Sequence, residues 1–174
     1  MFDTIFSLPI HPLIVHATVV IVPTAAASVI LAAALPRFRR WAGVVPLLLS
    51  ISAAVLVPIT TSSGEQLEKH LPQNDLIEKH AQLADGLLLP VLIMLVAAIA
   101  LCWVYLREQA ATTPDGYAAA VANRIGGAGP TVLPVFAAIA LVAVIGSGYT
   151  VVQVARIGHS GAKAAWSGVA QNNP

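Results

Sequence analysis

Charged residues and cysteine are both scarce in this chain, and each shortage restricts what the protein can be. Only 10% of its 174 residues are charged, while 57% are hydrophobic, whereas a soluble domain carries about 25% charged residues. So few charges cannot cover a globule of this size with polar surface, and we expect lipid to cover part of it. The single cysteine, Cys102, allows no intrachain disulfide, and the missing CxxCH motif excludes covalent c-type haem attachment.

Other absences exclude whole classes of function. The formal net charge is +1 and no basic patch is present, so nucleic acid is not an expected partner. No P-loop, dinucleotide-binding fingerprint or nucleophile elbow occurs, which favours an electron-transfer or accessory subunit over a stand-alone enzyme. No Lys or Arg precedes the first apolar run, so we expect a retained membrane anchor there rather than a removable signal peptide.

Four apolar stretches are long enough to cross a membrane, which takes about 20 residues for about 30 Å of hydrocarbon. They cover residues 12–35, 42–61, 83–106 and 131–155, with approximate ends. The sequence therefore predicts a single domain, an all-α integral membrane protein folded as an antiparallel bundle of four transmembrane helices. Each stretch contains one or more prolines, which membrane helices tolerate when neighbouring groups satisfy the freed carbonyls.

The short loops predict the orientation and the flanking structure. Residues 36–41 contain three arginines and no acid, so we assign this loop to the cytoplasm and both termini to the extracytoplasmic side of a bacterial inner membrane. The loop 62–82 is acidic and lies outside, with Asn74 expected as the N-cap of a short helix. Residues 117–125 are expected to form a surface helix, and residues 158–174 a polar tail.

All five histidines fall at one side of this predicted bundle, at its extracytoplasmic end: His11, His16, His70, His80 and His159. Imidazole binds zinc, copper and haem iron, and ionisable residues within membranes usually mark function. His16 and His80 are each expected about one turn inside a different helix, which is the arrangement that a bis-histidine b-type haem needs. His11 and His159 either form a second pair or complete a multi-histidine metal site.

His11 and His16 differ by about 140° on a regular helix, so they do not chelate one ion as an i, i+4 pair would. Either His11 leaves the helical path or the two serve different centres. Gly148, like other glycines near these helix ends, would make room for a flat porphyrin, and Arg156 would pair with a haem propionate. Glu65 and Asp85 would hydrogen-bond a ligand imidazole or join a metal site.

These residues also have simpler interpretations. Small residues allow close helix packing in membranes, and Arg156 would serve as a headgroup anchor. Single histidines are tolerated at membrane interfaces, and His70, two residues before Pro72 in irregular chain, fits that interpretation best.

Three segments resemble a known family. The opening His11-Pro12-Leu13-Ile14-Val15-His16 is similar to the His-Pro-x-x-Val-His start of a family of predicted four-helix bacterial membrane proteins, the domain-of-unknown-function family 2231. The resemblance extends over nearly the whole chain and implies the four-helix membrane fold and histidine ligands, while the family's activity is unassigned. In the family the opening usually continues Phe-Pro-Ile, where this chain differs. The other similar segments are Ile77-Glu78-Lys79-His80 with Asp85-Gly86, and Gly158-His159-Ser160-Gly161.

Three functions remain open at this point. The first is a b-type cytochrome with one or two haems, passing electrons between quinone and a partner or serving as a membrane subunit of a redox complex. The second is a zinc- or copper-handling protein that uses histidines and carboxylates. The third is a structural accessory subunit without a cofactor.

Overall fold

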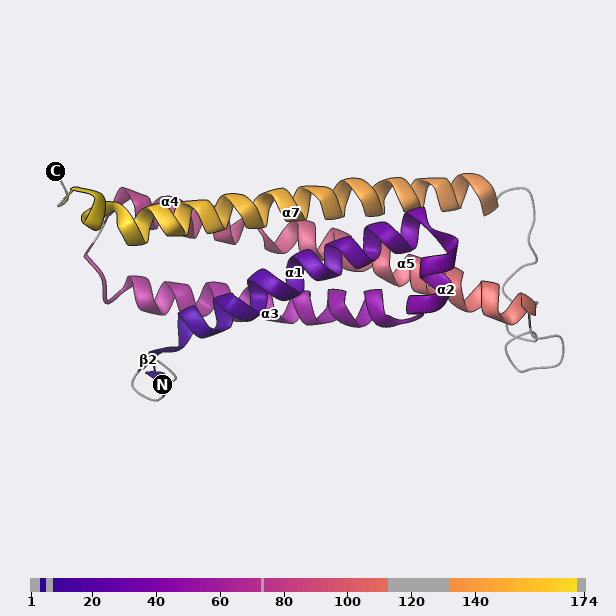
Figure 1. Ribbon diagram of the computed structural model, residues 1–174, viewed down its shortest axis with the longest axis horizontal. Coiled ribbons are helices and arrows are strands. Elements are labelled where there is room, and N and C mark those ends of the chain that lie inside the picture. The colour runs from indigo at the N-terminus through magenta and orange to yellow at the C-terminus, as the bar shows by residue number, and fades with distance from the viewer. Residues whose placement is uncertain (1–3, 6–7, 73, 113–131, 172–174) are drawn as a thin grey trace.

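The computed structural model describes residues 4–5, 8–72, 74–112 and 132–171, and it consists of long helices aligned in one bundle (Figure 1). Two short strands, β1 (Thr4–Ile5) and β2 (Leu8–Pro9), pair antiparallel before the first helix. The helices are α1 (Ile10–Ala34), α2 (Pro36–Ala42), α3 (Val45–Glu68), α4 (Asp75–Asp85), α5 (Leu88–Thr112) and α7 (Val132–Gln171).

The long helices form an antiparallel bundle, as predicted. Helix α1 packs against α3 and α7, and α5 packs against the same two helices, while α1 and α5 also meet across the centre. Helices α1 and α4–α5 run in one direction and α3 and α7 in the other, so α1 begins and α7 ends at the same end of the bundle. We call this the histidine end, since all five histidines lie near it.

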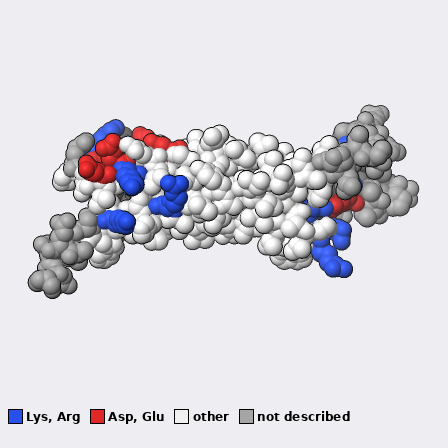
Figure 2. Space-filling model, turned by 90° about the horizontal axis from the view of Figure 1, so that it is seen from above, with Lys and Arg blue, Asp and Glu red and all other residues white. Residues whose placement is uncertain are grey.

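The surface of the bundle is apolar where a membrane would surround it. Four helical segments of the described chain are long and apolar enough to span a membrane, and no more than 39% of any span is buried within the protein. Large hydrophobic side chains therefore point outward along most of the length. Charged side chains gather at the two ends and leave the middle uncharged (Figure 2). This pattern is typical of a helical bundle whose solvent is lipid.

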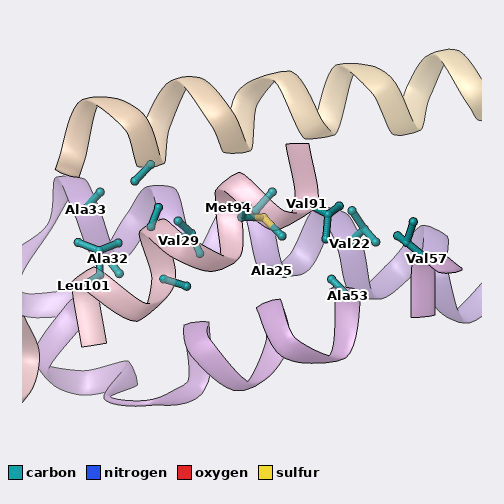
Figure 3. Close-up of a cluster of buried hydrophobic side chains, with 14 of the residues drawn as sticks. Val22, Ala25, Val29, Ala32, Ala33, Ala53, Val57, Val91, Met94 and Leu101 are labelled. Carbon is teal, nitrogen blue, oxygen red and sulfur yellow. The ribbon is translucent and has the colours of Figure 1, made fainter. Parts of the chain in front are cut away.

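The core between the helices is built from small and medium side chains, mainly of α1, α3 and α5, with Ala143 from α7 (Figure 3). Val22 and Val29 of α1 and Val91 of α5 are fully buried, and Met94 fills the space beside alanines of α1. Small residues let membrane helices approach closely, because packing rather than water exclusion drives their association.

Three expectations about helix boundaries are wrong. The second span continues beyond residue 61 to Glu68, because the polar residues at its end are compatible with a helix that leaves the membrane. The fourth span does not end at 155, and the expected polar tail is helical as far as Gln171. Its alanines favour helix regardless of polarity. The first loop forms α2, with Pro36 in its first turn and Gly43 ending it at φ 57°.

The expected N-cap is confirmed, since the Asn74 side chain accepts a hydrogen bond from the backbone N–H of Leu76 at 2.9 Å. The helix that it caps, α4, ends at Asp85 and is followed almost directly by α5, so the third span has a short lead-in. The expected surface helix over residues 117–125 lies outside the described residues.

The end opposite the histidines is held by an ion pair that the sequence did not suggest. Arg39 of α2 is 3% exposed. It is paired with Glu108 of α5 and donates to the Ala32 carbonyl at 2.8 Å. Its guanidinium also lies 5.0 Å from the ring centre of Phe136 in α7. One of the three arginines of the first loop is therefore a structural contact rather than a free surface charge.

Candidate functional site

His11 lies at the start of α1 and is half-buried against the end of α3. Its Nδ1 is 2.9 Å from the hydroxyl oxygen of Ser63, and a backbone hydrogen bond links the ring to Thr60. A Cβ added to Gly64 would lie 3.0 Å from the ring carbon Cε1. The imidazole of His11 therefore packs directly on the backbone of α3, where glycine leaves room for it.

His80 on α4 has the same surroundings, made by α7 instead of α3. Its Nδ1 is 3.0 Å from the Ser160 hydroxyl and 3.2 Å from the Ile157 carbonyl. A Cβ added to Gly161 would lie 3.0 Å from Cε1 of the ring. Each histidine is thus held by a Ser-Gly pair on the neighbouring helix, and we call these two dipeptides, Ser63-Gly64 and Ser160-Gly161, the Ser-Gly pairs.

The carbonyls beside the two rings favour one tautomer. The Ser63 hydroxyl lies 2.8 Å from the Thr60 carbonyl and the Ser160 hydroxyl 2.8 Å from the Ile157 carbonyl, so each serine can donate its proton there. A serine that does so has no second proton, and its oxygen then accepts from the histidine. In this arrangement Nδ1 carries the hydrogen and Nε2 keeps its lone pair. This is the form in which histidine binds a metal, with the other nitrogen held by a hydrogen bond.

His11 and His80 lie at the same end of the bundle although they are far apart in the sequence. Charges on the two imidazoles are within range of an electrostatic interaction. They come from different helices, and each is partly buried at the histidine end. The other three histidines are exposed, so these two are the ones that the fold buries in part.

The other three histidines lie on the outside. His16 is exposed, and its Nδ1 contacts the Pro12 carbonyl one turn earlier. His70 lies beyond α3 and contacts the Gln66 carbonyl at 2.8 Å, and His159 is exposed on α7. Of the predicted pair His16 and His80, the structure places His80 partly inside the bundle and leaves His16 exposed, while His11 is partly buried instead.

The remaining predicted site residues are not gathered around this pair. Glu65, Asp85 and Arg156 are exposed, and Arg156 donates to the Gln153 side chain at 3.1 Å. A Cβ added to Gly148 would meet nothing within 4 Å, so open space lies beside it. In the described ranges, no three residues of the types His, Cys, Asp and Glu form a group that could hold a metal ion.

The two serines and the role of the glycines were not predicted from the sequence. Gly64 does not make room for a porphyrin but for the imidazole of His11, and Ser160 and Gly161 were noted only as part of a family resemblance. One signal was available, because the dipeptide Ser-Gly occurs near the histidine end of both α3 and α7.

Comparison with known proteins gives one match. A family model described as "Predicted membrane protein (DUF2231)" matches residues 7–174. No curated protein and no solved structure matches the chain. The match covers the histidine end, both Ser-Gly pairs and all four spans.

Proposed function

The chain belongs to this family of predicted membrane proteins, and we propose that it binds one b-type haem with His11 and His80 as the axial ligands. One observation carries the proposal. Two histidines from different helices lie at one end of the bundle, within range of an electrostatic interaction, and the Nδ1 of each is 2.9–3.0 Å from a serine hydroxyl. With the hydrogen on Nδ1, each Nε2 would be free to bind iron. A bound haem would supply reversible one-electron chemistry, and the protein would set its position and its surroundings.

Haem is favoured over zinc or copper by the number of ligands. A structural zinc site takes four protein ligands and a catalytic site three. Haem brings four nitrogens of its own and needs two from the protein, which is the number that His11 and His80 supply. The described residues hold no larger group of metal-ligating side chains. A histidine and carboxylate site for zinc or copper is the alternative that the experiment below would reveal.

The histidine end is proposed to face the extracytoplasmic side of a bacterial inner membrane. The short loop at the opposite end, residues 36–41, carries three arginines and no acid. Short loops rich in Lys and Arg are typical of the cytoplasmic side, and this supports the proposed orientation. We propose that electrons pass between quinone and a larger redox complex, in which this chain is a membrane subunit.

The test is a visible spectrum of the protein purified in detergent from cells grown with ample haem. Oxidised protein and protein reduced with dithionite should differ by sharp α and Soret bands, and a haemochrome assay should give one haem for each chain. His11→Ala and His80→Ala should abolish these bands. His16→Ala, His70→Ala and His159→Ala are matched controls that should retain them, because all three side chains are exposed.

A wild-type protein with no haem bands would reject the proposal. Elemental analysis of the same sample would then distinguish a metal-binding protein from an accessory subunit without a cofactor. Loss of the bands in His16→Ala but not in His11→Ala would show that haem binds elsewhere than at the His11–His80 pair.

A further inference from the structure

The two halves of the bundle share one pattern of burial. When the two sequence segments are aligned so that His11 matches His80, the buried positions of α1 match buried positions of α5. The same alignment pairs Thr18 with Leu87, and both are buried. Five further pairs are buried in both helices: Val22 with Val91, Ala25 with Met94, Ser28 with Ala97, Val29 with Ala98, and Ala32 with Leu101.

The second helix of each half shows the same correspondence. Aligning α3 with α7 so that Ser63 matches Ser160 also matches Gly64 with Gly161. The buried Ser50 and Ala53 then match Ser147 and Thr150, which are buried as well. Thr60, the backbone partner of His11, falls on Ile157, the backbone partner of His80. Both registers are set by residues of the histidine sites, and each then matches buried positions further along the helices.

The arrangement in space agrees with a two-fold relation. Helices α1 and α5 run parallel and meet across the centre, and α1–α3 packs as α5–α7 does. Around a two-fold axis along the bundle, equivalent residues of the two central helices should lie beside one another. Figure 3 draws Val22 beside Val91 and Met94 beside Ala25. The larger residues of α5 pack against the smaller residues of α1, so the halves are complementary rather than identical.

From this symmetry we propose that the chain is an internal duplication of a helix pair, and that the two Ser-Gly pairs are equivalent positioning residues for His11 and His80. The glycine lets each imidazole lie against the neighbouring helix, and the serine holds the hydrogen on Nδ1. This inference rests on the proposed function, in which the two contacts present two equivalent Nε2 ligands to one haem. Many membrane proteins are built from such parallel repeats related by an axis along the membrane normal.

The experiment is nitrogen-15 NMR of the histidine rings in the full chain, labelled at histidine, in detergent without haem and at a pH where the rings are neutral. His11 and His80 should both have the hydrogen on Nδ1. Ser63→Ala should move only His11 part of the way toward the Nε2–H form, and Ser160→Ala should do the same only for His80, because the Ile157 carbonyl still accepts from its Nδ1. Ser63→Thr keeps the hydroxyl and should restore the first pattern, and Ser62→Ala is the exposed neighbouring control.

Two results would overturn the inference. One is a hydrogen on Nε2 of either ring in the wild-type protein. This result can be obtained even if no variant folds. The other is an unchanged tautomer in both serine-to-alanine variants. Because the measurement needs no haem, it can succeed even if the wild-type protein proves unable to bind haem, in which case only the proposed function fails. In protein that does bind haem, both variants should raise the midpoint potential by a similar amount, since each weakens one ligand.

Discussion

The contact between Gly161 and His80 predicts a specific cost for adding one methyl group. In Gly161→Ala the new Cβ would lie 3.0 Å from Cε1 and 3.3 Å from Nδ1 of the ring, so the imidazole must move by a few tenths of an ångström. The movement would lengthen its bonds to Ser160 and Ile157. Overpacking of this kind costs about 1–3 kcal/mol. Alanine also gains about 1 kcal/mol over glycine in a helix.

Gly158 on the same helix provides the matched control, because a Cβ there would meet nothing within 4 Å. Gly158→Ala gains the same helix propensity without the clash. The two variants should therefore differ in unfolding free energy by about 1–3 kcal/mol, the cost of overpacking alone. Unfolding with SDS in mixed micelles, followed by tryptophan fluorescence, would measure this difference. Equal stabilities would refute the claim that His80 packs on the backbone of α7.

Three further predictions concern polar groups inside the bundle. Glu108→Gln leaves Arg39 buried without its counter-charge and should cost about 3–5 kcal/mol in the same unfolding assay; a loss below about 1 kcal/mol would mean that Arg39 reaches water. Ser147→Ala should be neutral or stabilising, because its buried hydroxyl has no hydrogen-bond partner in the part of the chain described, whereas Ser50→Ala should cost about 0.5–1.5 kcal/mol for its lost bond to Pro46. A larger loss of stability in Ser147→Ala than in Ser50→Ala would contradict this prediction. The Thr18 and Thr60 hydroxyls are 2.7 Å apart, so a double-mutant cycle with valine at both positions should give a coupling of about 0.6 kcal/mol; a coupling of zero would show that α1 and α3 do not meet there.

The sequence was sufficient for the spans and their order, because lipid selects for long apolar helices. It was insufficient for the helix ends. Outside the hydrocarbon, polar residues such as those after Thr61 and after Gly158 continue a helix without any hydrophobic signal. The break near Gly43 depends on a backbone conformation that composition alone does not reveal.

The choice between His11 and His16 could not be made from the sequence. The angle between them on α1 showed that they face different directions, but which direction is interior depends on where α3 packs. The triplets Glu68-Lys69-His70 and Glu78-Lys79-His80 are identical in sequence, yet His70 is exposed and His80 is partly buried. The repeat that matters is much longer, and it is visible only when burial of all four helices is compared.

Binding of haemin to the cofactor-free protein tests the central claim most directly. Titrations followed at the Soret band should saturate at one haemin for each chain in the wild-type protein and in His16→Ala. In His11→Ala and in His80→Ala, the low-spin spectrum should be lost to a similar extent, because each ring supplies one of the two axial ligands. A low-spin spectrum retained in both of these variants would contradict the account.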